Sequence, residues 1–320
     1  YITPFGVSWR VPCPTIVLRI CFKSHKSMIK LTSQGKKDII MGYLSDLSDK
    51  EWECIKDLFP TQKRMGRPRK HGFRQIINAI FYIDRTGCQW RYLPSDFAPW
   101  QTIYGYFRTW QKIGFITKIH DHLRRKLRRY LGREEDPSAS AIDSQSIKTT
   151  ETGTCDVGYD GNKKIKGRKR HILVDTFGFL LAVFVHSAEI IDKVAASIFV
   201  KNTPKPSSRL KVVWADMGYI KAPLTIAVKQ KWGAKLEIKK HAWQGDQRVW
   251  VKKGSKVPKS QVITKPKGFV VLPKRWVVER TFAWLGKHRR HSKDYERYPH
   301  NSEMWILISM TRNMLQRLSK

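Results

Sequence analysis

The sequence is poor in acidic residues, poor in cysteine and without a long hydrophobic run. Only 26 of its 320 residues are Asp or Glu, against 62 Lys and Arg, and the formal net charge is +36. No apolar run approaches the roughly 20 residues that a membrane-spanning helix needs. Five scattered cysteines without a Cys-x-x-Cys pair argue against a zinc site and a disulfide framework. We therefore expect a soluble, intracellular protein with no membrane association.

What the sequence does contain is enough apolar surface to build packed cores. Hydrophobic residues make up 41% of the chain and aromatic residues 12%, which excludes a disordered basic tail. The length predicts two domains. Because a protein that neutralises many phosphates releases counterions and gains affinity, so large a positive charge indicates a polyanionic partner, with nucleic acid the first candidate.

The first 40 residues show neither a helical nor a strand period. The apolar stretch from Val11 to Phe22 is interrupted by Pro12, Pro14 and Arg19, so we do not interpret it as a secretory signal. We expect residues 1–40 to be a flexible arm or an upstream translation product. The folded protein is expected to begin near Met41.

Residues 41–136 are predicted to form an all-helical domain. Ser48 and Glu51 have the spacing of a capping box at the start of a helix. A second helix is indicated by apolar residues that repeat at helical spacing, namely Phe73, Ile76, Ile77, Ile80 and Phe81. The same pattern predicts helices around residues 100–110 and 116–131.

This helical domain carries two groups of cations that we expect to contact DNA. One lies in the Gly- and Pro-containing loop 66–72, and the other on the polar side of the last helix, where five cations occur in six positions without an acid. Neighbouring like charges repel, so a phosphate backbone explains them better than the alternative, a solvated face. The expected contacts are Arg67, Arg69, Lys70, Arg124, Arg125 and Arg128.

Residues 137–320 are predicted to form an α/β domain that follows the acidic boundary at 134–138. Strands are expected at 139–148, 171–175, 180–185 and 210–215, and helices around 189–200, 220–232, 276–287 and 305–318. This part has 36 Lys and Arg against 14 acids, a net charge of +22, whereas residues 41–136 have 19 against 11, a net charge of +8. The α/β part is therefore expected to handle nucleic acid itself.

Three acids in this basic part form a candidate catalytic site. Asp143 and Asp216 belong to predicted strands and Glu279 to a predicted helix. Each alone could be an ordinary salt-bridge partner. Together they match the need of phosphodiester chemistry for hard oxygen ligands that hold two Mg²⁺ ions, or Mn²⁺ in their place, roughly 3.5–4 Å apart.

At these residues the chain resembles the DDE transposases of bacterial insertion sequences, in the group of the fourth and fifth insertion-sequence families. The resemblance runs from about Met41 to Lys320. It rests on Asp143-Ser144-Gln145-Ser146, Asp175-Thr176-Phe177-Gly178, Ala215-Asp216-Met217-Gly218-Tyr219 and Trp276-Val277-Val278-Glu279-Arg280-Thr281-Phe282-Ala283-Trp284-Leu285. It implies a ribonuclease H-like core preceded by a helical DNA-binding domain. It also implies that Asp143, Asp216 and Glu279 are the metal-binding catalytic triad.

The chain departs from the wider group's pattern in two places. In that pattern, two residues separate Tyr from Arg, three separate Arg from Glu, and six separate Glu from Lys. Arg275 and Glu279 fit it, but Leu272 replaces the Tyr and Gly286 the Lys. Lys287 is expected to take the Lys role if the helix continues to it, because Arg275, Glu279 and Lys287 then share one helical stripe. The resemblance implies that Arg275 and Lys287 contact the terminal DNA. The second departure is a polar, Lys-rich insertion near 240–265, which leaves the activity of this copy open.

Further cations near the expected site are predicted to bind the DNA backbone. Six lie in eight residues before a predicted strand, and two follow the Glu279 helix; a solvated loop is the alternative for the first group. They are Lys163, Lys164, Lys166, Arg168, Lys169, Arg170, Arg289 and Arg290. Since phosphate contacts carry no sequence information, recognition of element ends is assigned to the helical domain.

The predicted function is therefore a transposase that acts on double-stranded DNA, both element ends and target. We expect a homodimer or larger complex on paired ends, in the cytoplasm and at the nucleoid of a bacterium. Two alternatives remain: a catalytically inactive DNA-binding protein or regulator derived from such a transposase, and a basic RNA-associated structural protein.

Overall fold

The computed structural model describes residues 42–61, 68–151, 153–220, 222–238 and 276–320. Leu44–Lys320 forms one compact unit, separate from Tyr1–Tyr43. The expected arm at 1–40, Arg67, Leu272, Arg275 and the polar insertion near 240–265 lie outside the described residues.

The first part of the compact unit is helical, as predicted. Its helices are α1 (Asp49–Glu53), α2 (Phe73–Thr86), α3 (Trp100–Lys112) and α4 (Phe115–Tyr130), with short 3-10 turns at Lys56–Leu58 and Trp90–Tyr92. The capping box is confirmed: the Glu51 backbone N–H donates to Ser48 Oγ at 3.2 Å, and the Ser48 N–H donates to Glu51 Oε2 at 2.8 Å. Both bonds satisfy backbone donors that would otherwise be unpaired at a helix start.

A six-stranded mixed sheet follows, formed by β1 (Ala139–Lys148), β2 (Gly158–Asp160), β3 (Ile165–Asp175), β4 (Leu180–Ser187), β5 (Val212–Ala215) and β6 (Lys235–Ile238). The strand order is β2-β3-β1-β5-β6, and β4 pairs with β3. The β1·β3 and β3·β4 pairs are antiparallel, whereas β1·β5 and β5·β6 are parallel. The predicted hairpin is confirmed; the short strands β2 and β6 were not predicted.

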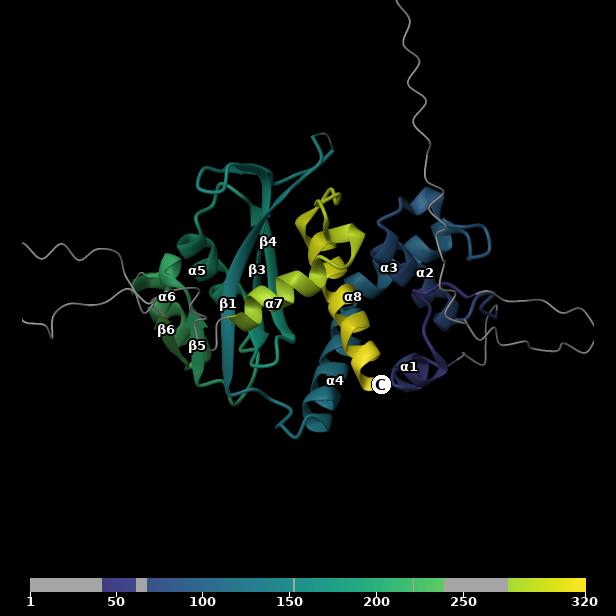
Figure 1. Ribbon diagram of the computed structural model, residues 1–320, viewed down its shortest axis with the longest axis horizontal. Coiled ribbons are helices and arrows are strands. Elements are labelled where there is room, and N and C mark those ends of the chain that lie inside the picture. Colours follow the sequence, from purple (N-terminus) through teal and green to yellow (C-terminus); the bar gives the residue numbers. More distant parts are fainter. Residues whose placement is uncertain (1–41, 62–67, 152, 221, 239–275) are drawn as a thin grey trace, which may run out of the picture. The chain divides into compact units, whose positions relative to one another are not determined.

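Helices cover both faces of the sheet (Figure 1). On one face, α5 (Asp192–Asn202) and α6 (Ala222–Ala227), which continues into a π-helical turn at Val228–Trp232, pack on Ile142 and Leu173. On the other, α7 (Trp276–Leu285) and α8 (Pro299–Leu318) pack on Ala141 and Ile172. Ala141 and Ile142 are neighbours in β1, so their assignment to different cores follows the alternation of side chains along a strand.

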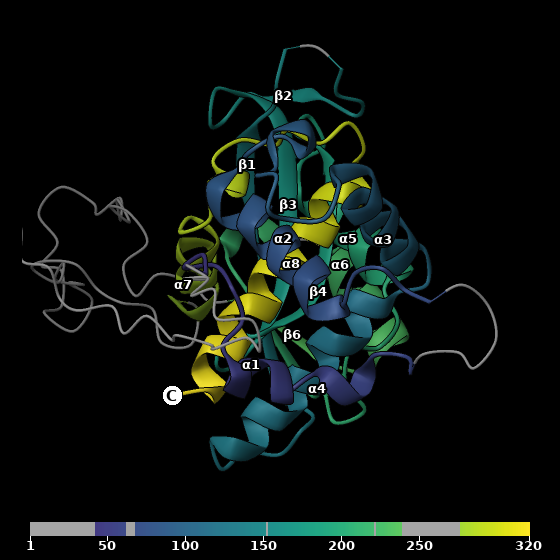
Figure 2. The same cartoon turned by 90° about the vertical axis from the view of Figure 1, so that its right-hand side faces the viewer.

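The helical part and the sheet are joined by α8, which lies against α2 and α4 (Figures 1 and 2). Trp305, Ile308 and Leu315 of α8 belong to the same hydrophobic core as α2, α3 and α4. The boundary expected at residues 136/137 therefore does not separate two cores, because one helix from the C-terminus completes the first. Within the described residues, no helix has both the length and the hydrophobicity needed to cross a bilayer.

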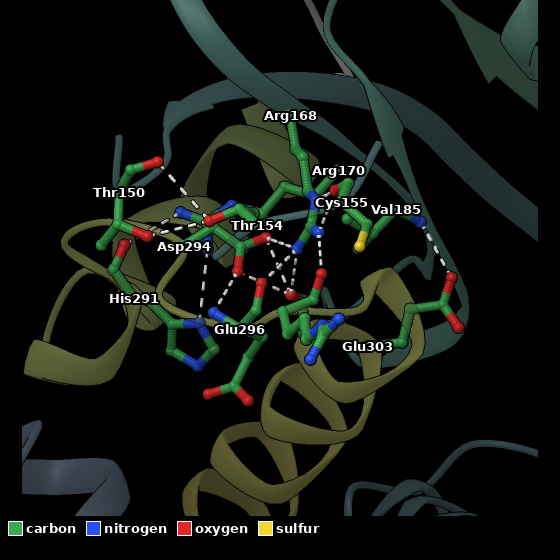
Figure 3. Close-up of polar contacts among 12 residues, drawn as sticks. Thr150, Thr154, Cys155, Arg168, Arg170, Val185, His291, Asp294, Glu296 and Glu303 are labelled. Atoms are coloured by element: carbon green, nitrogen blue, oxygen red, sulfur yellow. Dashed lines mark hydrogen bonds and ion pairs between the residues drawn. The ribbon is translucent and has the colours of Figure 1, made fainter. Parts of the chain in front are cut away.

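A buried carboxyl on α8 makes the stability depend on pH. The Val185 backbone N–H of β4 donates to Glu303 Oε1 at 2.9 Å (Figure 3). Burial raises the pKa of Glu303 from 4.5 to about 7. The folded state therefore holds a proton that the unfolded state releases between these pH values, so this contribution to stability is present below pH 4.5 and lost as the pH rises through 7.

We expect the free energy of unfolding of Glu303→Gln at pH 8 to exceed that of the parent by about 1–3 kcal/mol. The glutamine can accept the same N–H bond and has no charge to bury. At pH 4 the two proteins should differ little. Urea unfolding at both pH values measures the effect, and the exposed Glu189→Gln serves as the matched control. An equal difference between Glu303→Gln and its parent at both pH values would contradict this explanation.

Candidate active site

Asp143 and Asp216 both come just after the paired part of the parallel strands β1 and β5: Asp143 is in the middle of β1, which continues to Lys148, and Asp216 directly follows β5. The β1·β5 pairing ends at Ala141 opposite Trp214, and each aspartate is two residues further along its own strand direction. Asp216 retains an extended backbone, with φ −83° and ψ −178°. Because alternate residues point to the same face of a sheet, both aspartates are on the side of Ala141 and Trp214, which is the side that α7 covers.

Local backbone bonds orient both carboxylates. Asp216 is the N-cap of the 3-10 turn Met217–Tyr219, and its Oδ1 accepts the Gly218 N–H at 2.9 Å. Asp143 Oδ1 accepts the Ser144 N–H at 2.8 Å. The pKa of the buried Tyr219 is raised well above its ordinary value, first by burial and then by the negative charges of Asp143 and its neighbours. The carboxylates thus form a local concentration of negative charge in a cationic protein.

Glu279 belongs to the first turn of α7, where its side chain is exposed. This helix packs on the sheet through its apolar side, including Val278 and Phe282. Two bonds to the β3–β4 turn hold it in place: Arg280 Nη2 donates to the Phe177 carbonyl and Thr281 Oγ1 to the Gly178 carbonyl, both at 2.8 Å. The sheet therefore positions the helix that carries the third acid.

The donor set suits a divalent metal, but the described residues do not contain a ready-made site. Carboxylate oxygens are the ligands that Mg²⁺ prefers, and Asp143 and Asp216 each come two residues after the last β1·β5 pair. Among the residues that the structure describes, however, no group of three or more His, Cys, Asp or Glu side chains is arranged to hold an ion. The two aspartates offer suitable oxygen ligands, and Glu279 is exposed on the helix that packs on their side of the sheet, without forming a three-ligand group with them.

A polar cluster beside Asp143 was not predicted from the sequence. Ser144 Oγ donates to Asp192 Oδ1 at 2.9 Å, and Lys169 Nζ lies 3.4 Å from the same oxygen. These contacts tie β1 to the start of α5 and to β3 next to the candidate site. The one signal in the sequence was an acid in the first turn of a predicted helix, which is too common to indicate a site.

Three of the cations assigned to a DNA-binding loop are buried in β3, so that prediction was wrong. The strand begins at Ile165, earlier than expected, and is covered on both faces. Arg168 is fully buried, and its guanidinium donates to the carbonyls of Glu296 and Arg297 at 2.8 and 2.7 Å (Figure 3). Lys169 Nζ donates to the Ile190 carbonyl at 3.1 Å.

Arg170 is the third of these, and its guanidinium donates to Gln145 Oε1 at 2.7 Å. Burial lowers the pKa of Arg170 to about 10. Buried cationic groups that donate to internal carbonyls and amides cannot also contact a DNA backbone at the surface. All three residues of this strand are therefore excluded as DNA contacts.

Two α4 cations and one after α7 are also internal. Arg124 and Arg128 are 2% and 4% exposed; Arg128 forms an ion pair of 2.5 Å with the fully buried Asp175. Arg290 is buried and pairs with Glu296. The helical stripe expected to include Lys287 does not form, because α7 ends at Leu285.

The remaining predicted contacts within the described residues are exposed and stay proposals. They lie before α2, on the outer side of α4, before and at the start of β3, and after α7. They are Arg69, Lys70, Arg125, Lys163, Lys164, Lys166, Lys287 and Arg289.

The fold and the carboxylates define an α/β protein with one acid within the central strand β1 and another directly after the parallel strand β5. Residues 134–314 match the family described as "Transposase DDE domain", and residues 47–120 match the family described as "Putative transposase of IS4/5 family". A 16.2 kDa protein of insertion element IS402 from Burkholderia cepacia is 30% identical over 114 residues, which are 33% of this chain and 76% of that protein. No solved structure matches the chain.

The chain therefore belongs to the DDE transposase family, in the IS4/5 group of insertion sequences. This confirms the resemblance found in the sequence. The mixed sheet with flanking helices and the transposase-domain match also confirm the predicted fold class, a ribonuclease H-like core preceded by a helical region.

Proposed function

We propose that this transposase binds the terminal inverted repeats of an insertion sequence and catalyses Mg²⁺-dependent cleavage and strand transfer of DNA. End recognition is assigned to the helical region at 44–133, and metal binding to Asp143, Asp216 and Glu279. Two or more copies would act on paired ends at the nucleoid.

The observation that supports this proposal most is the position of the two aspartates. They are 73 residues apart in the sequence, yet each comes two residues after the last β1·β5 pair, Ala141 opposite Trp214. In open α/β sheets, ligands bind outside the carboxyl ends of the strands, and Asp216 directly follows the carboxyl end of β5. Glu279 is carried by a helix that packs on the same face. An arrangement of ordinary surface acids would not need this convergence.

In the proposed reaction, a water molecule attacks a phosphodiester at the element end, and the bond to the 3′ oxygen breaks. The freed 3′-hydroxyl then attacks a phosphodiester of the target: a new bond joins the element end to the target 5′ phosphate, and the bond to the target's 3′ oxygen breaks and leaves a 3′-hydroxyl on the target strand. Bound metal ions lower the pKa of the attacking water and stabilise charge on the leaving oxygen. The chain supplies two aspartates already oriented by backbone N–H groups, a glutamate on a packed helix, and exposed cations to hold the phosphate backbone.

The test is a cleavage assay with the full chain and a duplex that carries the ends of its element. We expect new 3′-hydroxyl ends with Mg²⁺ or Mn²⁺ and none after chelation with EDTA, while DNA binding persists without metal. Strand breaks that survive chelation would contradict the metal-dependent mechanism. Metal-independent binding without any breaks would favour the alternative, an inactive DNA-binding derivative.

A further inference from the structure

A cationic cleft lies between the C-terminal half of α3 and the start of α8, and none of the predicted contacts belongs to it. Its volume is about 350 Å³, and it is lined by Arg108, Thr109, Gln111, Lys112 and His300. None of these described lining residues is acidic. Arg108 and Lys112 are exposed, one helical turn apart on α3, so both ammonium and guanidinium groups are open to a ligand.

The two walls of the cleft are held together before any ligand arrives. Gln111 Nε2 donates to the His300 carbonyl at 2.9 Å and to Asn301 Oδ1 at 3.1 Å. Arg108 Nη1 donates to Tyr104 Oη at 3.3 Å, which directs the guanidinium along α3. A cleft whose walls are fixed in this way loses little conformational entropy on binding.

The buried Arg168 of β3 holds the loop that leads into α8 (Figure 3). Its guanidinium binds the Glu296 and Arg297 carbonyls, and Ser302 Oγ donates to Asp294 Oδ1 at 2.7 Å. The backbone is therefore anchored to β3, while the Arg297 side chain is exposed at the surface. The buried Arg168 thus holds in place the backbone segment whose Arg297 side chain is exposed to solvent.

Next to His300 of the cleft, the residues just before α8 add an aromatic ring and a further cation. Tyr298 is 41% exposed. Its ring stacks on that of His300 with centroids 5.4 Å apart, and the Arg297 guanidinium lies over it at 5.4 Å. The first turn of α8 contains no acid, and Tyr298, its N-cap, makes no side-chain capping bond. The partial positive charge of this 20-residue helix therefore adds to that of the side chains.

We infer that this cleft, formed by Arg108, Thr109, Lys112 and His300, binds phosphate groups of a double-stranded DNA backbone. Arginine offers paired donors, lysine a point charge and threonine a hydroxyl, which together suit phosphate oxygens. The proposed action on element ends favours DNA over an acidic peptide as the occupant. The inference rests on the proposed function and adds a backbone contact on the helical region, away from the carboxylates.

The test compares the salt dependence of duplex binding for the full-length parent and two double variants. Arg108→Gln with Lys112→Gln removes two cleft charges, and Lys201→Gln with Lys229→Gln removes two exposed charges on the α5 and α6 side. We expect the slope of log Kd against log salt concentration to fall by about two for the cleft variant only. Arg108→Lys with Lys112→Arg, which retains both charges, should keep the parental slope.

An unchanged slope for the cleft variant, or an equal fall in both Gln variants, would overturn the inference. So would loss of poly-glutamate binding with duplex binding intact, because the cleft would then be an acidic-peptide site. Cleavage is measured separately. If the parent protein binds the duplex without cutting it, the catalytic proposal is refuted. The salt slopes of binding then still test the phosphate contact in the cleft.

Discussion

Asp143→Asn is expected to reduce DNA cleavage at least about 1,000-fold, because metal ions contribute several kcal/mol to transition-state stabilisation and each 1.36 kcal/mol corresponds to a factor of ten. An amide has nearly the shape of a carboxylate but lacks the charge that a divalent ion requires. Asp216→Asn should have a similar effect, since each aspartate comes two residues after the last β1·β5 pair. Single-turnover cleavage of end-containing DNA measures both.

Three comparisons make this result specific. Affinity for duplex DNA should change by less than about threefold, because the substitutions remove negative rather than positive charge. Asp57→Asn, an exposed acid in the 3-10 turn Lys56–Leu58, should cut like the parent. Glu279→Gln tests the third ligand. Parental cleavage by Asp143→Asn would refute the assignment of the site, and parental cleavage by Glu279→Gln alone would remove only that residue.

The second large effect concerns stability. We expect Arg128→Met to lower the free energy of unfolding by about 3–5 kcal/mol, because it leaves the Asp175 carboxylate buried without its cation. Asp175 is fully buried, and its Oδ1 accepts the N–H groups of Phe177 and Phe179, each at 2.9 Å. The substitution therefore disturbs both the α4 contact and the β3–β4 turn.

The neighbouring residue is the matched control. Arg129 is 62% exposed and pairs with Glu135 at 3.1 Å, so Arg129→Met should change the free energy of unfolding by less than about 1 kcal/mol. Urea unfolding at neutral pH measures both variants. If Arg128→Met were as stable as its parent and lowered the salt slope of DNA binding by about one, Arg128 would be a phosphate contact after all.

Helices and several strands were predictable because their signals are local. The Ser48 and Glu51 capping box and the helical spacing of Ile76, Ile77 and Ile80 depend only on residues one turn apart. β1 has the predicted bounds because polar neighbours limit it at both ends. The start of α8 was missed: it begins at Pro299 rather than Trp305, since its first turn is polar.

Exposure of cations was not predictable in the same way. Six cations in eight residues indicate a solvated segment by composition, yet Arg168 is fully buried. Its partners include the Asp294 carboxylate and the Glu296 and Arg297 carbonyls, which are 126, 128 and 129 residues away in the sequence. Similarly, residues 124–129 of α4 contain five cations and no acid, but Asp175 comes from another element and neutralises Arg128. Composition records charge, whereas burial depends on which elements pack together.

The sequence by itself determined the family, the helical spacing and the residue types available for metal chemistry. Only the tertiary structure decided that β1 pairs in parallel with β5, which brings Asp143 to Asp216, and that α8 completes the core of the helical region. It also decided which cations face the solvent. The physical reason is that local patterns reflect interactions within a few residues, whereas strand register and burial depend on contacts between segments far apart along the chain.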